Sequence, residues 1–191
     1  MKNNKIFTTL CVLCSFFLLT GFFGGDQTPK EERQEILEMR KTTLNDLYKE
    51  LPSAKEVVED SIGYAVFNNV GINLLAVSTA NGSGVAYNKK TGKNIFMKMF
   101  SAGVGIGLGV KDFRGIFVFF TQESLDNFVN MGWQAGAQAD VAAKSGEKGE
   151  ALAAAIDVAP GIILYQLTKT GLALQATIQG TKYWKDEELN K

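Results

Sequence analysis

The stretch Ser101–Lys111, SAGVGIGLGVK, decides between two very different structures, because it places a glycine at every second position four times. A phosphate-binding loop requires G-x-G-x-x-G or G-x-x-x-x-G-K-[ST] at a strand-to-helix turn, and this stretch has neither spacing. Read as a strand, it has one apolar face and one face without side chains, against which rings such as Phe117 and Phe119 can lie. The sequence therefore predicts a strand over residues 102–110 whose bare face, for packing or for a ligand, consists of Gly103, Gly105, Gly107 and Gly109.

Glycine and aromatic residues dominate the composition of this chain. Its 191 residues include 20 glycines and 13 phenylalanines but only 3 prolines, and 46% of the residues are hydrophobic. This length is typical of one domain, and this apolar content is enough for a packed core. We therefore expect a β-rich fold rather than a helical bundle or a disordered chain.

The N-terminus has the features of a bacterial secretory signal. Lys2 and Lys5 form a positively charged start, and an uncharged run of 18 residues follows from Ile6 to Phe23. Residues 1–25 are therefore predicted to be a signal peptide. The alternative is an uncleaved anchor, because the run is just long enough to span a bilayer. We expect an exported protein of the periplasm or cell envelope.

Residues 26–191 contain neither cysteine nor histidine, because Cys11 and Cys14 both lie in the apolar N-terminal run. Each cysteine follows a leucine, whereas a lipid-modified cysteine follows a small residue. Disulfides, thiol nucleophiles, histidine-dependent triads and His/Cys metal sites are therefore excluded from the mature chain. The sequence predicts a protein that is not an enzyme and that holds no cofactor or metal. The carboxylates nearest to apolar stretches are more typical of turns than of an acid–base pair; they are Asp112, Asp140 and Asp157.

The predicted fold class is α+β, with helices first and strands after them. Thr28-Pro29-Lys30-Glu31 is a helix-start pattern, and apolar residues then recur at helical spacing as far as Leu51, before Pro52. Ser53-Ala54-Lys55-Glu56 predicts a second capping box and a short helix to about Asp60. The favoured role of the first helix is to cover the sheet, since its mixed polar face is unlike that of a membrane-surface helix.

From Ile62 onward the periodicity changes to that of short strands separated by glycine and asparagine. The residues 113–121, FRGIFVFFT, are apolar on both faces and predict a central, buried strand. We expect four segments: residues 1–25, helices in 26–60, a β-rich domain over 61–184 and a charged tail, 185–191. The charged end of the chain, residues 182–191, is expected to fray. The expected elements are strands at 62–67, 74–79, 83–88, 94–100, 102–110, 113–121, 161–168 and 172–179, and a helix at 122–130.

Charge is distributed unevenly along the chain. Residues 61–111 carry five lysines and no acidic residue. Without residues 1–25, the chain has 18 basic and 20 acidic side chains, so the remainder of it carries a net charge of −7. Such asymmetry indicates an interaction face or a one-sided solvated surface.

The segment 89–100, KKTGKNIFMKMF, is the main candidate for that face. Its aromatic rings and long lysine side chains suit a membrane interface with anionic headgroups, where each lysine contributes on the order of 1 kcal/mol. The alternative is an exposed lysine-rich turn in front of a half-buried strand. The predicted lipid contacts are Lys89, Lys90, Lys93, Phe96, Lys98 and Phe100.

Four motifs, in the same order, resemble the SYLF domain family, and the likeness runs from about Ser53 to Trp184. Asn68 stands where the family has proline, and Gln166 and Ala176 also depart from its pattern. The motifs are SIGYAVFNNVG at 61–71, GSGVAY at 82–87 followed by Thr91-Gly92, SAGVGIGLGVKD at 101–112, and the segment 164–180 that begins LYQ and contains GLA.

This resemblance implies an α+β domain with N-terminal helices and a strongly curved antiparallel sheet or barrel-like sandwich. Eukaryotic SYLF proteins bind phosphoinositide membranes and some bind actin, whereas bacterial members are secreted or envelope proteins. We therefore expect a non-enzymatic envelope module that associates with anionic phospholipid, without actin or nucleic acid as a partner. The alternatives are a protein-interaction domain of the envelope without lipid preference, and a carrier of a small apolar ligand.

Overall fold

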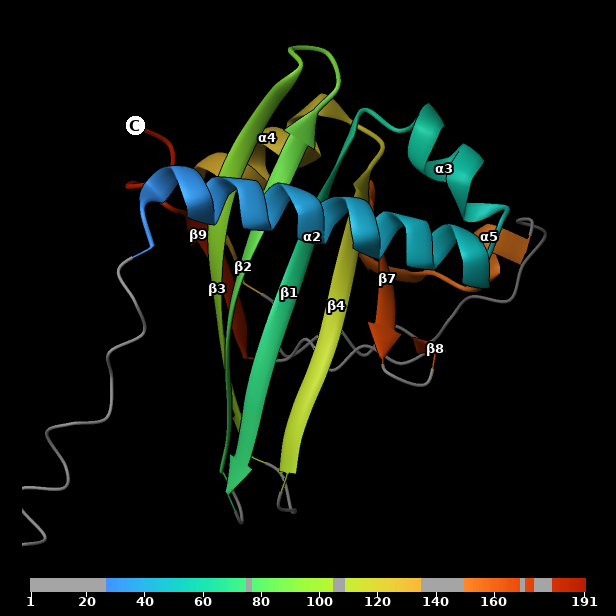
Figure 1. Ribbon diagram of the computed structural model, residues 1–191. Helices are drawn as coiled ribbons and strands as arrows, with labels where there is room; N and C mark the ends of the chain where they lie inside the picture. Colours follow the sequence, from blue (N-terminus) through green and yellow to red (C-terminus); the bar gives the residue numbers. More distant parts are fainter. Residues whose placement is uncertain (1–26, 75–76, 105–108, 135–149, 169–170, 174–179) are drawn as a thin grey trace, which may run out of the picture.

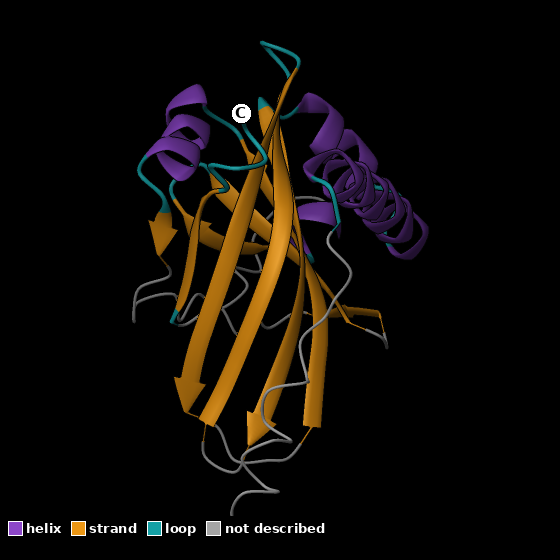
Figure 2. Cartoon of the chain, turned by 60° about the vertical axis from the view of Figure 1, so that its left-hand side comes forward, coloured by secondary structure: helices purple, strands orange, loops and turns teal. Residues whose placement is uncertain are grey.

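The computed structural model describes residues 27–74, 77–104, 109–134, 150–168, 171–173 and 180–191, and it confirms the α+β class. Figure 1 shows a strongly curled antiparallel sheet, with helix α2 crossing its strands on one side. Figure 2 shows α2 and α3 on one side of the sheet and α4 on the other. We call the side toward α4 the inner face and the side toward α2 the outer face.

The first helix forms as its sequence predicts, and the second begins differently. Helix α2, Pro29–Glu50, starts at a complete capping box between Thr28 and Glu31. Helix α3, Ala54–Asp60, is present, but Ser53 has helical backbone angles and its side chain makes no capping hydrogen bond. The predicted second capping box is therefore wrong, because a cap requires an extended backbone at that residue.

The sheet contains nine strands among the described residues, and every pairing in it is antiparallel. Its order is β5-β9-β3-β2-β1-β4-β7-β6, with β8 paired to β7. The strands are β1 Gly63–Leu74, β2 Val77–Asn88, β3 Lys93–Val104, β4 Gly109–Phe119, β5 Trp133–Gln134, β6 Ile156–Ala159, β7 Ile162–Thr168, β8 Gly171–Ala173 and β9 Thr181–Lys185; the helices α4 Gln122–Asn130 and α5 Glu150–Ala153 complete the described elements.

Several strands are longer than the sequence predicts. The predicted strands 74–79 and 83–88 are one strand, β2, and β1 continues through the asparagine pair at 68–69, which the sequence assigns to a turn. The predicted strand 102–110 is wrong in its extent, because its residues belong to two different strands. Gly103 lies near the end of β3, and Gly109 begins β4. Those two strands are separated in the sheet by β2 and β1, while Gly105 and Gly107 lie outside the described residues.

A face without large side chains does exist, but it belongs to β2. Its inner positions are Ala80, Gly82, Gly84 and Ala86, and Gly84 lies directly opposite Phe67 of β1. A Cβ atom at Gly84 would overlap the Phe67 ring and the Val66 carbonyl oxygen. Glycine is therefore required here, and it also lets the sheet bend toward its inner face.

An aromatic cluster fills the inner face beneath α4. The Phe67 and Tyr183 ring centroids are 4.7 Å apart, and the Phe117 and Phe128 centroids are 5.1 Å apart. Strand β4 lies between β1 and β7, and its residues 116–119 are buried, which confirms the predicted central strand. This cluster joins β1, β3, β4, β7, β9 and α4 in one core.

The outer face is covered by α2 and α3, which confirms that the first helix covers the sheet. Leu47 and Leu51 of the α2 end pack with Val66 and Ile116 of the sheet. Toward the start of α2, Ile36 packs with Val85, Phe96 and Leu189. The side chain of Leu189 is only 2% exposed, so the predicted fraying of the tail is wrong.

The two glycines beside Phe67 provide a test of this packing. Gly84→Ala is expected to lower the free energy of unfolding by about 1–3 kcal/mol, because the added methyl group overpacks the core. Gly115→Ala on the other side of Phe67 is the matched control, since its Cβ would meet Leu164 at an ordinary 3.4 Å. Urea unfolding followed by circular dichroism measures both, and equal losses would contradict this account.

Candidate functional site

The predicted lipid contacts lie on the β2–β3 hairpin, but the structure does not bring all six together at one surface. Lys90 and Lys93 are exposed at the turn, and Phe100 is 40% exposed. Phe100 lies seven residue steps along β3 from Lys93, which is about 23 Å. Phe100 therefore cannot enter a membrane at the same point as the tip of the hairpin.

Lys89 interacts with α3 rather than with solvent alone. Its Nζ donates hydrogen bonds to the carbonyl oxygens of Val58 and, at 2.6 Å, of Glu59. These carbonyls belong to the last turn of α3, where a cation is favourable. Burial lowers the pKa of Lys89, and the carboxylates of Glu59 and Asp60 oppose that shift. Lys89 therefore fixes the position of α3.

Phe96 and Lys98 hold the C-terminal tail. Phe96 is 7% exposed, and its backbone N–H and carbonyl both bond the side chain of Asn190, at 3.0 and 2.7 Å. The Lys98 ammonium pairs with the buried Asp186 carboxylate at 2.8 Å. The partners that occupy these two residues lie about 90 residues away in the sequence, so a local sequence pattern could not reveal them.

The Asp186 carboxylate is the centre of this tail contact. Burial would raise its pKa, but hydrogen bonds from Lys98 and from the backbone N–H groups of Leu189 and Glu188 together lower it. A lowered pKa contributes stability at pH values above the ordinary aspartate pKa of about 3.9. That contribution is lost as the pH falls through the lower, folded-state value.

Asp186→Asn tests this contact. At pH 7 we expect the substitution to lower the free energy of unfolding by about 1–2 kcal/mol, because it removes a charge-assisted hydrogen bond at a half-exposed lysine. At pH 3, below the ordinary aspartate pKa, the difference from the wild type should be smaller than at pH 7. Urea unfolding at both pH values measures it, and an undiminished difference at pH 3 would contradict the assignment. Lys41→Gln, which breaks an exposed pair with Glu38, is a control expected to change little.

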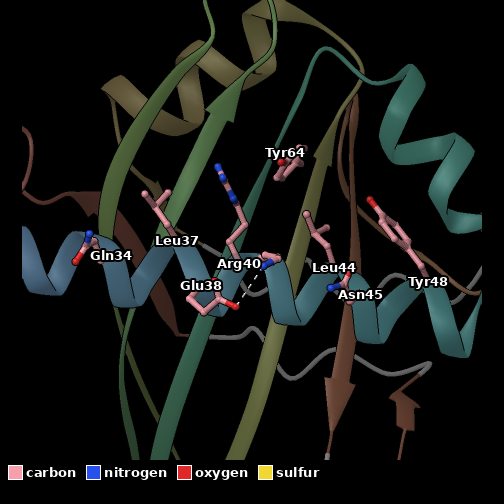
Figure 3. Close-up of a pocket in the computed structure, with 9 residues that line it drawn as sticks. Gln34, Leu37, Glu38, Arg40, Leu44, Asn45, Tyr48 and Tyr64 are labelled. Atoms are coloured by element: carbon pink, nitrogen blue, oxygen red, sulfur yellow. Dashed lines mark ion pairs between the residues drawn. The ribbon is translucent and has the colours of Figure 1, made fainter.

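A groove lies beside α2, between that helix and β1 (Figure 3). Leu44 and Tyr48 of α2 line it together with Tyr64 of β1, while Arg40 bonds Asn94 Oδ1 at 2.6 Å. Burial is the largest cause that raises the pKa of Tyr48 to about 12, and it also raises the pKa of Tyr64. Both phenols therefore remain protonated at neutral pH, and they can act only as neutral hydrogen-bond donors and acceptors.

Two further observations concern the part of the chain that the structure describes. Within it, no group of three or more His, Cys, Asp or Glu side chains could hold a metal ion. None of the helices in these same segments is both long and apolar enough to cross a membrane.

A second cluster was missed by the sequence reasoning. Asn69 and Gln166 are polar residues at inward positions of β1 and β7, 1% and 6% exposed. The signal for Asn69 is that it continues the inward alternation of Ala65 and Phe67, which its assignment to a turn obscured. Gln166 stands alone among apolar neighbours in β7, Ile162–Thr168.

The architecture defines a class: a curled antiparallel sheet, covered by N-terminal helices on one face and filled by aromatic rings on the other. Residues 100–191 match the Ysc84 family, which is described as "Las17-binding protein actin regulator". The chain is also 39% identical over 165 residues to beta cell expansion factor A of Aeromonas veronii. That alignment covers 86% of this chain, and the chain spans only 61% of the relative's length. The resemblance to the SYLF family that the sequence predicts is therefore confirmed, with the Ysc84 model matching over residues 100–191.

Proposed function

We propose that this protein is a non-enzymatic module of the cell envelope that associates with anionic membrane lipid through the end of the sheet that carries the β2–β3 turn. Similarity to the SYLF family supports a lipid-binding type of domain, and SYLF proteins are not known as enzymes. Export to the envelope rests on the signal-like residues 1–25. The proposal does not include actin, although the family description names an actin regulator.

The main support for the proposal is that the β2–β3 turn projects from the rest of the molecule. In Figures 1 and 2 the tip of the β2–β3 hairpin extends beyond the helices at its end of the sheet. Residues 90–94 are all exposed, and a Cβ atom at Gly92 would have nothing within 4 Å. Lys90 and Lys93 can therefore approach a flat anionic surface without hindrance from the rest of the described chain. Lys89 contributes less, because it is bound to α3 and lies near Glu59 and Asp60.

An apolar anchor lies at the same end of the sheet, and it differs from the two that the sequence predicts. Asn88 pairs with Gly63, and Gly63 pairs with Phe119, so the start of the turn and the end of β4 lie level across three strands. Phe120, the next residue, is 41% exposed. The backbones of β2 and β4 are two strand spacings apart, about 10 Å. We therefore assign Phe120 as the anchor beside Lys90 and Lys93, in place of Phe96 and Phe100.

Co-sedimentation with phosphatidylglycerol and phosphatidylcholine vesicles tests the proposal. The wild type should bind only the anionic vesicles and should lose binding at high salt. Lys90→Gln with Lys93→Gln should weaken partitioning about ten-fold or more, since each lysine contributes on the order of 1 kcal/mol. Phe120→Ser should weaken it further without changing the salt dependence.

The matched control is Lys30→Gln with Lys41→Gln, which removes the same charge from exposed positions on α2. Equal losses in the two double variants would show that net charge, and not the hairpin tip, governs binding. No binding to anionic vesicles at any salt concentration would favour the alternative, a protein-interaction domain of the envelope.

A further inference from the structure

Three buried polar atoms on the inner face have no hydrogen-bond partner among the described residues. They are Nδ2 and Oδ1 of Asn69 and Oε1 of Gln166. Native proteins leave few buried polar groups unpaired, because each costs the full free energy of its desolvation. Two amide side chains in one region of a core therefore call for a common explanation.

The two amides lie in one layer of the inner face, just beyond the aromatic cluster. Asn69 pairs with Phe113 of β4, and Gln166 pairs with Gly115, two residues further along that strand. Phe67 and Leu164 occupy the preceding inward positions of β1 and β7 and belong to the core. Asn69 and Gln166 are thus diagonal neighbours across β4, and both line one small cavity.

The cavity between the two amides has the size of one water molecule. The space open to the centre of a water molecule is about 10 Å³, and a single buried water requires about 10–15 Å³ by this measure. An ion is disfavoured, because no charged residue lines the cavity to compensate for its lost hydration. The remaining walls are Phe67, Met99, Phe113, Gly115, Leu164 and Tyr183.

We propose that this cavity is a binding site for a single water molecule, which bridges Asn69 and Gln166 and so joins β1 to β7 across β4. The water accepts a hydrogen bond from Asn69 Nδ2 and donates one to Gln166 Oε1. It fits equally well if the oxygen and nitrogen of the Asn69 amide are exchanged, since it then donates to both amide oxygens. Two polar partners are enough to hold a buried water in a protein interior.

This site is independent of the lipid contact proposed above. Asn69 lies six residue steps along β1 from Gly63, which is level with the start of the β2–β3 turn, so the two sites are about 20 Å apart. The bridge holds the sheet together in the layer where aromatic packing ends. Variants of the two amides should leave vesicle binding unchanged, and the two proposals can fail separately.

Nuclear Overhauser effects between water and the side-chain amides of the whole protein, labelled with ¹⁵N, test the site directly. The Asn69 signal is assigned with Asn69→Leu. We expect it to show an effect whose sign is that of a long-lived bound water, and rotating-frame spectra separate this effect from proton exchange. The Asn190 amide, which bonds the carbonyl oxygens of Phe96 and Asp186, is the control and should not show that sign. Absence of the effect at Asn69 would overturn the proposal.

A double-mutant cycle tests whether the two amides share this water. Asn69→Leu and Gln166→Met each remove one amide and nearly keep the size of the side chain. Each substitution alone should lower the Tm by about 3 °C or more, because it leaves the other amide and the water with fewer hydrogen bonds. The double variant should lose less than the sum of the two, since it leaves neither amide unpaired.

Gln122→Met is the matched control for this cycle. Gln122 Oε1 is also buried without a partner among the described residues, but it lies on α4 and does not line the cavity. Its effect on the Tm should add to that of Asn69→Leu. If Gln166→Met raises the Tm, its amide is unpaired in solution and the proposal is wrong. Simple additivity of Asn69→Leu and Gln166→Met would also refute it, because no water would then connect them.

Discussion

The contact of the Phe67 ring with the glycines on either side of it is the constraint on which the rest of this structure depends. Gly84 lies opposite Phe67 on β2, and Gly115 lies opposite it on β4. Because neither glycine has a side chain, the Phe67 ring can lie across the sheet and contact Phe117, Phe128 and Tyr183. Because large side chains are concentrated on only some of the strands, the sheet can curl around them, and α4 closes the resulting core.

The same glycine at position 115 has a second consequence, further along the inner face. Beyond Phe67, the inward position of β1 is Asn69, and beyond Leu164 the inward position of β7 is Gln166. Aromatic rings could have filled this layer as they fill the layer before it. Instead it holds two buried amides, and three of their polar atoms have no hydrogen-bond partner among the described residues.

Strand β3 shows how a structural role can resemble a binding motif in sequence. Its inward residues, Met97 and Met99, belong to the core, while Phe96 and Lys98 on the outer side receive the C-terminal tail. Arg33 of α2 also bonds the Leu189 carbonyl at 2.7 Å, so both ends of the described chain meet over this strand. The aromatic and cationic pattern of 89–100 is therefore mainly the pattern of a docking strand, and only its turn remains free for another partner.

The sequence by itself determined the α+β class, helix α2 with its capping box, the central strand β4 and helix α4. These depend on interactions within a few residues or on a simple alternation of apolar side chains. Only the tertiary structure decided which lysines are exposed, because the partners of Lys89 and Lys98 come from α3 and from the tail. It also decided that β2, rather than residues 102–110, supplies the bare face, and that Asn69 is buried. Strand register and neighbour identity set these features, and register depends on contacts between residues that are distant in the chain.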